Sequence, residues 1–283
     1  MPRQGNETSC LFGPVNSRRL GHSLGIDLVK FKTCTFNCVF CECGRTTALT
    51  TERQIFIPTA KVLRELGLFF AKPHCDSLRP SSTLFASVSA GYSAQRPPRR
   101  DHHAETSSPG PVDVLTFSGG GEPTLAANLG EVIAEIKKNY PAYKVCLLTN
   151  STLLSDSQVR AEIKLADIII PSLNAVSPPA FQKINRPPVS VTPEKVLSGL
   201  LDLRREYTGQ LLLEIFIVPE VNDTPQELAL LREAAALIKP DGVQLNSLDR
   251  AGAEDWVKPA SAENMQKIKE FFKNFNTNYY LQR

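Results

Sequence analysis

The sequence predicts an α/β fold, an open partial (β/α)6 barrel of the TIM-like kind, and three observations support it. Short apolar stretches recur along the chain, and stretches with apolar residues at helical spacing follow them. The short stretches are nearly continuous in apolar residues, which is typical of parallel strands covered by helices on the outer face of a sheet. A chain of 283 residues can bury a core of barrel size. We therefore expect six strand-then-helix units.

The first unit is predicted between residues 25 and 71. The segment before residue 25 contains glycines and an adjacent pair of arginines, and we expect a loop there. Residues 25–31 (GIDLVKF) alternate apolar and polar side chains, which predicts a strand with one covered face. Residues 58–71 carry apolar residues at helical spacing behind Pro58, a residue that suits the first turn of a helix.

The pattern breaks at residues 72–111, which are rich in Ser, Pro and Arg and show neither a strand nor a helix period. We expect a disordered insertion, because too little apolar surface is available to offset the ordering of the chain. Its histidines and cysteine (His74, Cys75, His102 and His103) are given no role. The predicted organisation is an N-terminal extension at 1–24 and a core domain at 25–283, interrupted by the insertion at 72–111.

Regular alternation resumes at residue 112 and continues to residue 275. Strands are predicted at residues 112–117, 144–149, 166–170, 211–218 and 242–246, and helices at residues 125–139, 156–164, 193–207, 225–238 and 260–275. In parallel β/α folds the loops after the carboxyl ends of the strands gather at one rim, where catalytic groups are found. The motifs described next all follow predicted strands.

Residues 33–43 (TCTFNCVFCEC) concentrate cysteines in one compact loop. Cys34, Cys38 and Cys41 form a C-x3-C-x2-C run, with Phe40 directly before the last cysteine. Thiolates spaced this closely can bind the same metal ion or cluster. A [4Fe-4S] cluster usually takes four protein thiolates, so three would leave one iron free for another ligand. Alternatively, Cys43 supplies a fourth sulfur for a structural zinc site, although such sites typically bring two cysteine pairs from separated knuckles.

The cysteine loop and residues 117–123 (FSGGGEP) together resemble the radical S-adenosylmethionine (SAM) superfamily. The flanking stretches FGPVNSRRLGHSLGIDLVKFKTC and GRTT are similar to a subgroup of Fe-S oxidoreductases related to the tRNA wyosine-base enzymes. The resemblance runs from about Phe12 to Asn246, with one interruption. It implies the partial (β/α)6 barrel of the radical SAM type.

The resemblance also implies the chemistry. A [4Fe-4S] cluster bound by Cys34, Cys38 and Cys41 would leave one iron to the amino and carboxylate groups of SAM. One electron from the cluster then cleaves SAM to methionine and a 5'-deoxyadenosyl radical, which abstracts hydrogen from a substrate. The electron comes from a reducing partner, such as a flavodoxin-like or ferredoxin-like protein.

The resemblance assigns the SAM contacts to the rim. Matching residues bind the amino group of SAM (Gly120, Gly121, Glu122), its adenine (Phe40) and its ribose or carboxylate (Ser172, Asn174), and Asn150 is a further candidate. The residues alone allow other roles. Glycines after a strand can form a tight turn, Phe40 can be an apolar plug, and short polar residues after buried strands are often helix caps or turn formers.

The composition indicates the cellular compartment and the classes of partner to expect. The formal net charge of +3 indicates no strongly electrostatic nucleic-acid footprint. The seven cysteines do not form a disulfide framework, and a reducing cytoplasm is expected. The N-terminus lacks the features of a signal peptide and no run is long enough to cross a bilayer, so we expect no membrane insertion.

Two further function classes compete with a radical SAM oxidoreductase. One is an Fe-S electron-transfer or cluster-binding protein without SAM chemistry, in which a fourth protein thiolate would complete the cluster. The other is a catalytically inactive homologue that binds a partner, although the intact motifs argue against it.

More than one class of substrate is compatible with the sequence. RNA is suggested by the wyosine resemblance, and a small molecule or a peptide is the alternative. Arg18 and Arg19 are either a solvated surface pair or the anchor of a substrate phosphate or carboxylate near the cluster. Glu214, Asn246, Asp249 and Arg250 are further candidate substrate contacts.

Overall fold

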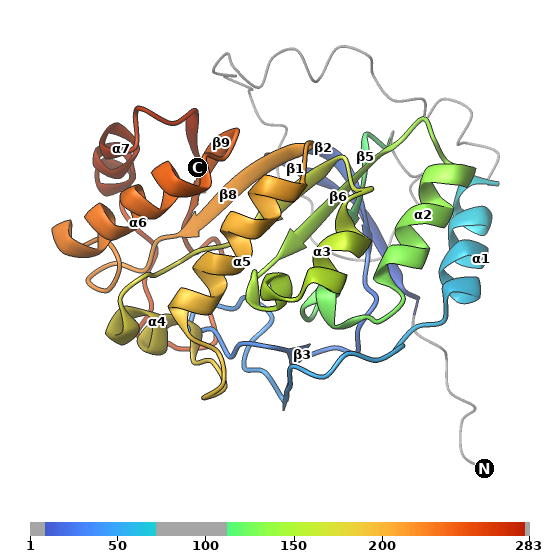
Figure 1. Ribbon diagram of the computed structural model, residues 1–283, viewed down its shortest axis with the longest axis horizontal. Helices are drawn as coiled ribbons and strands as arrows, with labels where there is room; N and C mark the ends of the chain where they lie inside the picture. Colours follow the sequence, from blue (N-terminus) through green and yellow to red (C-terminus); the bar gives the residue numbers. More distant parts are fainter. Residues whose placement is uncertain (1–8, 72–111, 281–283) are drawn as a thin grey trace.

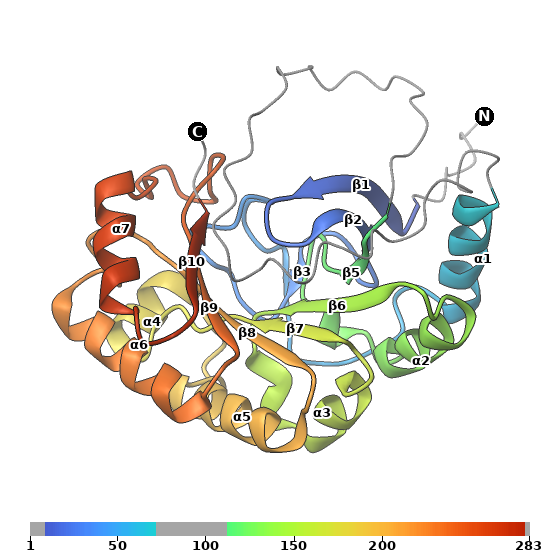
Figure 2. The same cartoon turned by 90° about the horizontal axis from the view of Figure 1, so that it is seen from above.

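The computed structural model describes residues 9–71 and 112–280, and the predicted insertion at 72–111 lies outside these residues (Figure 1). The described residues contain an eight-stranded sheet with the strand order β1-β2-β5-β6-β7-β8-β9-β10. The β1 and β2 strands are antiparallel, and every other neighbouring pair is parallel. The sheet curls into a half-barrel with helices along its outer face (Figure 2). The predicted partial barrel is therefore confirmed.

The strands are β1 (Leu11–Ser17), β2 (Gly21–Ile26), β3 (Thr33–Cys34), β4 (Ala48–Leu49), β5 (Val114–Phe117), β6 (Lys144–Thr149), β7 (Ile168–Pro171), β8 (Gln210–Phe216), β9 (Gly242–Asn246) and β10 (Thr277–Tyr280). The α-helices are α1 (Thr59–Phe70), α2 (Leu129–Asn139), α3 (Ser157–Ile163), α4 (Pro178–Asn185), α5 (Pro193–Glu206), α6 (Pro225–Ile238) and α7 (Ala262–Phe271), with short 3-10 helices η2 (Pro123–Leu125) and η3 (Thr152–Ser155). The six predicted strand-then-helix units are present, from β2 with α1 to β9 with α7.

The prediction of a loop before residue 25 is wrong. Residues 11–26 form the β1-β2 hairpin, and β2 pairs in parallel with β5 in the main sheet. The register of the hairpin shifts between Phe12 and Val15, so β1 lacks the regular alternation that identifies a strand. The strand expected at residues 25–31 begins earlier, at Gly21, and ends at Ile26.

Two more elements were not predicted. The α4 helix begins at Pro178 and Pro179, with the Ser177 side chain accepting a hydrogen bond from the Ala180 amide as the N-cap. It is short, and its prolines resemble a loop signal. The β10 strand adds an edge next to β9. In addition, α2 begins at Leu129, four residues after the predicted start, because η2 occupies the chain before it.

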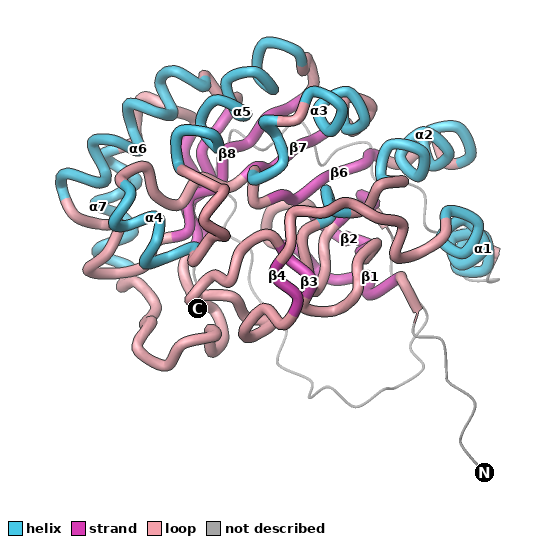
Figure 3. The backbone as a smooth tube through the Cα atoms, turned by 60° about the horizontal axis from the view of Figure 1, so that its bottom comes forward, coloured by secondary structure: helices cyan, strands magenta, loops and turns pink. Residues whose placement is uncertain are grey.

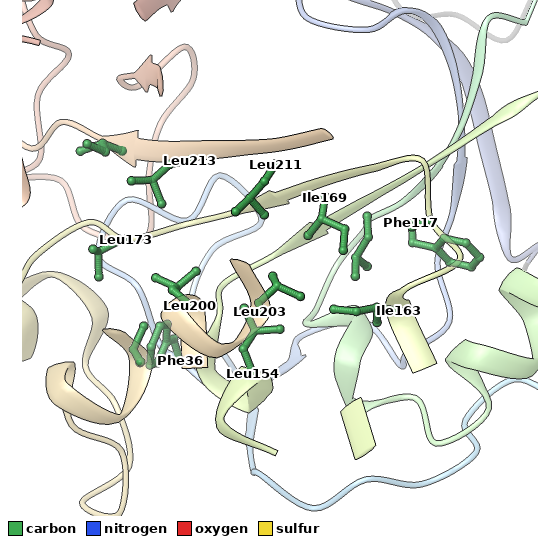
Figure 4. Close-up of a cluster of buried hydrophobic side chains, with 14 of the residues drawn as sticks. Phe36, Phe117, Leu154, Ile163, Ile169, Leu173, Leu200, Leu203, Leu211 and Leu213 are labelled. Carbon is green, nitrogen blue, oxygen red and sulfur yellow. The ribbon is translucent and has the colours of Figure 1, made fainter. Parts of the chain in front are cut away.

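The core lies between the sheet and the helices. Leu211 and Leu213 of β8 point outward and pack with Leu200 and Leu203 of α5 (Figure 4). The intervening Leu212 points the other way, as the alternation of a strand requires. It belongs to a small apolar group that fills part of the inner face of the half-barrel. The members of this inner apolar group are Leu20, Val114, Cys146, Ile168, Ile170 and Leu212, with Leu148 packed against them.

The loops at one side of the sheet carry the candidate site. Figure 3 shows β3 and β4 among these loops, away from the helices of the outer face. Thr33 and Cys34 of β3 pair with Ala48 and Leu49 of β4, which closes the cysteine loop at its base. Among the helices of residues 9–71 and 112–280, none combines the length and the apolar character that a bilayer crossing needs.

Candidate functional site

The cysteine loop is built from two tight turns. The Cys41 amide donates to the Cys38 carbonyl at 3.2 Å, and the Gly44 amide donates to the Cys41 carbonyl at 2.8 Å. Apolar residues anchor the loop beneath these turns. Phe36 is buried edge-on against Phe181 of α4, with ring centroids 5.6 Å apart. The backbone of the loop also bonds to the end of α4, since the Val39 amide donates to the Ile184 carbonyl at 2.9 Å.

Three of the thiols influence one another. Cys34, Cys38 and Cys41 are half-buried, whereas Cys43 is exposed. Burial raises the pKa of Cys34 to about 11 and raises that of Cys38 well above its ordinary value, and the charges of the neighbouring thiols act in the same direction. A hydrogen bond with Cys43 lowers the pKa of Cys41 to about 6 and raises that of Cys43. The structure thus brings the predicted cysteines into one electrostatically connected group.

The donor chemistry of this group suits an iron-sulfur cluster. A tetrahedral zinc ion with bonds of about 2.3 Å to sulfur draws its thiolates to about 3.8 Å from one another. Within the described residues, no set of three or more His, Cys, Asp or Glu side chains is arranged to hold one metal ion. A [4Fe-4S] cluster, with iron at alternate corners of a cube, is larger than a single zinc ion. Its thiolate ligands therefore lie further apart. Three soft thiolates on one loop are the donors that iron-sulfur clusters take.

The glycine stretch lies directly against the cysteine loop. The Lys32 amide donates to the Gly120 carbonyl at 2.8 Å, and the Glu122 amide donates to the Thr33 carbonyl at 3.2 Å. A Cβ on Gly121 would lie 2.0 Å from the Thr33 carbonyl oxygen, and one on Gly120 would lie 2.4 Å from the Phe31 ring. The glycines are therefore required by the close approach of the two loops. Sequence reasoning attributed them to the approach of a ligand.

Asp27 fixes the start of the same stretch. Its carboxylate accepts a hydrogen bond from the Gly120 amide at 2.8 Å and another from the Val29 amide at 3.2 Å. Burial raises the pKa of Asp27. Gly119 adopts a φ of +149°, and a Cβ there would lie 2.2 Å from the Asp27 carboxylate. Asp27 was not singled out from the sequence, although it directly follows the apolar end of a strand.

Glu122 is a buried carboxylate whose two oxygens accept different numbers of hydrogen bonds. Its Oε1 accepts from the Thr124 amide at 3.1 Å, from the Thr124 hydroxyl at 2.7 Å and from the Thr149 hydroxyl at 2.7 Å. Among the described residues, its Oε2 accepts from the Asn150 amide alone, at 2.8 Å. Burial raises the pKa of Glu122 although these hydrogen bonds oppose the shift. Oε2 retains acceptor capacity for a further donor such as an ammonium group.

The remaining rim residues are engaged with different partners. The Asn150 side-chain amide donates to the Thr35 hydroxyl at 2.7 Å and lies 3.5 Å from Cys34 Sγ. The Ser172 hydroxyl donates to Glu214 Oε1 at 3.1 Å. Asn174 is buried, and its Oδ1 accepts from the Phe216 amide at 2.8 Å. The structure thus brings Asn150 to the cysteine loop, while Ser172 and Asn174 link β7 to β8.

Phe40 packs on the ring of Phe216, a residue that the sequence analysis did not single out. Phe40 and Phe216 are stacked, with centroids 4.0 Å apart and planes 12° apart. Phe216 is the last residue of β8 and follows Leu212 and Glu214 at strand spacing, so its position on the inner face could have been derived from alternation. Phe40 also lies close to the loop after β9, because a Cβ on Gly252 would be 3.2 Å from its Cα.

The candidate substrate contacts form a polar network inside the half-barrel. Arg19 of the β1-β2 turn pairs with Glu214 of β8 and donates to Gln244 of β9 at 3.3 Å. Asn246 donates to Glu214 Oε2 at 2.7 Å. Arg18 pairs with Asp249 in the loop after β9. Arg19 therefore bridges the hairpin to the far strands, whereas Arg18 is an exposed residue that pairs with a loop.

Glu42 joins the cysteine loop to the loop after β9. Its carboxylate accepts from the Asp249 and Arg250 amides at 3.1 Å each, and Arg250 Nε donates to it at 2.8 Å. Arg250 therefore faces the cysteine loop. Glu42 stands between Cys41 and Cys43 in the sequence, and no role was predicted for it.

Known proteins similar to this chain were found by sequence. The radical SAM superfamily matches residues 105–231, which include β5 to the first half of α6 but not the cysteine loop. A UPF0026 protein of Synechocystis sp. is 40% identical over 237 residues, covering 83% of this chain and 74% of the relative. A UPF0026 protein of Methanocaldococcus jannaschii is 28% identical over 261 residues, covering 92% and 70%. A protein of Brachyspira hyodysenteriae named GTPase Obg is 31% identical over 266 residues, but the match spans only 34% of it.

Solved structures with low sequence identity share the fold. The structure of TYW1 with a lysine-pyruvate adduct bound has a TM-score of 0.60 at 16% identity, covering 89% of this chain and 73% of TYW1. A radical SAM methyltransferase from Sphaerobacter thermophilus has a TM-score of 0.60 at 13% identity, covering 92% and 66%. Since the Synechocystis relative is 40% identical over most of both chains, this chain belongs to the UPF0026 family and, with it, to the radical SAM superfamily.

Proposed function

We propose that this protein is a radical SAM oxidoreductase, in which a three-thiolate [4Fe-4S] cluster and SAM together abstract hydrogen from a substrate. The observation that carries the proposal is the direct contact between the cysteine loop and the glycine stretch. The hydrogen bonds from Lys32 to Gly120 and from Glu122 to Thr33 join the cysteine loop to the stretch that carries the buried carboxylate of Glu122. Among the described residues, Glu122 Oε2 accepts from the Asn150 amide alone, which leaves acceptor capacity for a ligand. When bound, the cluster supplies one electron to the sulfonium of SAM, which yields methionine and a 5'-deoxyadenosyl radical.

Cys34, Cys38 and Cys41 would hold the cluster. Burial keeps Cys34 and Cys38 protonated as free thiols, so cluster binding has to release their protons. Cys43 is exposed, and its thiol is hydrogen-bonded to that of Cys41, which supports a role outside the ligand set. The chain would then leave one iron without a protein ligand, as SAM binding requires.

Glu122, with the backbone of Gly120 and Gly121, would hold the ammonium group of SAM. A positive charge beside Glu122 Oε2 compensates the burial of the carboxylate and favours its ionised form. The side chain is fixed by Thr124 and Thr149, so it needs no reorganisation when a ligand binds.

The other rim residues would complete the SAM site. We assign Phe40 to the adenine, because it stands directly before the last cysteine of the run and its ring is stacked on Phe216. We assign Ser172 and Asn174 to the ribose or carboxylate, and Asn150 to the orientation of Cys34 through Thr35. The inner apolar group around Leu212 would exclude water from below the reacting atoms.

The partner and the substrate are proposed only by class. A low-potential one-electron donor, flavodoxin-like or ferredoxin-like, would reduce the cluster. The polar network of Arg19, Glu214, Gln244 and Asn246 lies inside the half-barrel and is the proposed lining of the substrate site. Its mixed charges suit a polar substrate, and RNA is one candidate.

The test is the formation of 5'-deoxyadenosine. Wild-type protein would be reconstituted with iron and sulfide without oxygen, reduced with dithionite and incubated with SAM. We expect 5'-deoxyadenosine and methionine from the wild type and neither from the Cys38→Ala variant. A fully loaded wild-type cluster that produces no 5'-deoxyadenosine would overturn the proposal and favour an electron-transfer protein.

A further inference from the structure

Lys32 is a buried lysine beside the cysteine loop. The residue is 5% exposed, and within residues 9–71 and 112–280 no carboxylate forms an ion pair with it. Its Nζ donates to the Gly44 carbonyl and lies 3.8 Å from Cys41 Sγ. A buried ammonium group that faces only neutral dipoles is costly, and such groups are normally paired with an anion. The position of Lys32 therefore points to a negative charge on the side of Cys41.

The backbone at Lys32 adds to this cost. Lys32 has a φ of +65°, in the left-handed region that glycine adopts freely and that costs other residues about 1 kcal/mol or more. The turn is closed by the Thr33 amide, which donates to the Lys30 carbonyl at 3.0 Å. A glycine would satisfy this turn with less strain. The turn therefore gives no reason for a lysine, and the reason lies in its side chain.

The direction of the side chain is fixed by its surroundings. The Lys32 amide donates to the Gly120 carbonyl at 2.8 Å, and its own carbonyl accepts from the Thr47 and Ala48 amides at 3.1 Å each. The backbone is thus held on both sides, between the glycine stretch and the end of the cysteine loop. The ammonium group is left inside the turn from Cys41 to Gly44, facing the thiol.

The cationic side chains around the cysteine loop differ in whether a carboxylate pairs with them. Arg250 is paired with Glu42 at 2.7 Å. The Lys32 ammonium group lies 3.8 Å from Cys41 Sγ. Among the described residues, Lys32 is therefore a cation without a carboxylate partner that faces the proposed ligand Cys41.

We propose that Lys32 is a positioning residue whose ammonium group hydrogen-bonds the Cys41 thiolate of the bound cluster and raises the reduction potential of that cluster. The inference rests on the proposed function, because it requires the cluster. Reduction adds one electron from the external donor and one negative charge, breaks no bond, and leaves the proton on Lys32. A nearby fixed positive charge stabilises the reduced form more than the oxidised form, and hydrogen bonds to the sulfurs act in the same direction.

The test is the reduction potential of three variants. Lys32→Met removes the charge and keeps an unbranched side chain, whereas Lys32→Arg keeps the charge. Lys30→Met is the matched control, because Lys30 is exposed, stands two residues away and loses the same formal charge. Reconstituted protein would be titrated without oxygen and without SAM, and the reduced cluster would be followed by electron paramagnetic resonance.

We expect Lys32→Met to lower the ratio of reduced to oxidised cluster about tenfold at a fixed potential, which corresponds to about 59 mV for a one-electron couple. Lys32→Arg and Lys30→Met should stay close to the wild type. If Lys32→Met has the same potential as Lys30→Met, the inference is wrong. Failure of Lys32→Met to bind iron, with normal binding by Lys32→Arg, would support a charge requirement. Failure of both would assign Lys32 a structural role and overturn the inference.

These outcomes are separate from those that test the proposed function. A wild-type protein that binds no iron-sulfur cluster would refute the proposed function itself. A wild-type cluster that forms but does not cleave SAM would refute the SAM chemistry and would leave the comparison of Lys32 variants intact.

Discussion

The Asn150 amide donates a hydrogen bond of 2.8 Å to Glu122 Oε2 and so joins the end of β6 to the turn after β5. The other carboxylate oxygen is held by Thr124 and Thr149. Glu122 is 2% exposed, and the burial of its charge is only partly offset by these bonds. Two neighbouring rim loops are therefore fixed to one another through a carboxylate whose ionised form is disfavoured by burial.

The stability of the free protein should depend on pH through Glu122. Burial raises its pKa above the ordinary value of 4.5, so the folded protein holds the proton more tightly than the unfolded chain. The contribution of this group to stability is fully present below pH 4.5 and is lost as the pH rises through the folded pKa. The free energy of unfolding of the wild type, relative to Glu122→Gln, should fall as the pH rises above 4.5. Urea unfolding of both proteins over this range measures it.

The Glu122→Ala variant serves as the control for the hydrogen bonds. It leaves four donors without a partner in a buried site, and it should be about 3 kcal/mol less stable than Glu122→Gln at every pH, because neither variant titrates at this position. If the difference between wild type and Glu122→Gln does not change with pH, the ionised carboxylate is not disfavoured by burial and the argument fails.

Gly121→Ala should destabilise the protein and displace the cysteine loop. The added Cβ would lie 2.0 Å from the Thr33 carbonyl oxygen and 2.6 Å from Val29 Cγ2, and the backbone contact cannot yield without moving Cys34. We expect a loss of about 1–3 kcal/mol in urea unfolding and reduced iron uptake. Gly67→Ala is the matched control, since it lies in α1 with only Tyr140 Oη nearby at 3.9 Å.

The control substitution should act in the opposite direction. Alanine in place of a helical glycine stabilises a helix by about 1 kcal/mol. If Gly121→Ala is as stable as Gly67→Ala, then the glycine stretch and the cysteine loop are not in close contact.

Arg53 should contribute strongly to stability, because it connects three segments near the site. It forms a two-pronged ion pair with Glu162 of α3 at 3.1 and 2.5 Å, and it donates to the Thr124 and Ala126 carbonyls at 2.8 and 3.0 Å. Both charged side chains are largely buried. Arg53→Ala leaves Glu162 without its ion pair and the Thr124 carbonyl without the Arg53 donor, and it should cost about 3–5 kcal/mol in urea unfolding.

The geometry of this ion pair can be separated from its charge. Arg53→Lys keeps the positive charge but cannot donate to two carboxylate oxygens and two carbonyls at once. We expect it to lose about half of the stability that Arg53→Ala loses. A lysine variant as stable as the wild type would show that charge alone is sufficient.

Much of the fold was predictable, because strand and helix periods are properties of short stretches. The predicted limits of β6, α6 and β9 agree with the structure, and β8 and α5 differ by one or two residues. The β1-β2 hairpin was missed because its register shift removes the alternation. The cysteine loop was predictable from its spacing alone.

The contacts within the site depend on distances between segments that no local pattern contains. The stacking of Phe40 on Phe216 joins residues 176 positions apart in the sequence, as follows from their numbers. The pairing of Arg19 with Glu214 likewise depends on the curl of the sheet. The burial of Lys32 depends on how the cysteine loop folds over it. The sequence indicates which residues are chemically suitable, and only the packing shows which of them are already bound to one another.

Cys43 should be dispensable for cluster binding, whereas Cys38 should not. Cys43 is exposed, and its thiol is hydrogen-bonded to that of Cys41. Cys38 is half-buried, and the charges of Cys34 and Cys41 raise its pKa. Cys43→Ala should therefore bind as much iron and sulfide as the wild type after reconstitution without oxygen, and Cys38→Ala should bind little. The exposed fourth thiol is the one difference between a cluster with an open iron and a closed four-thiolate site. Loss of iron in Cys43→Ala equal to that in Cys38→Ala would mean four protein ligands and no open iron for SAM.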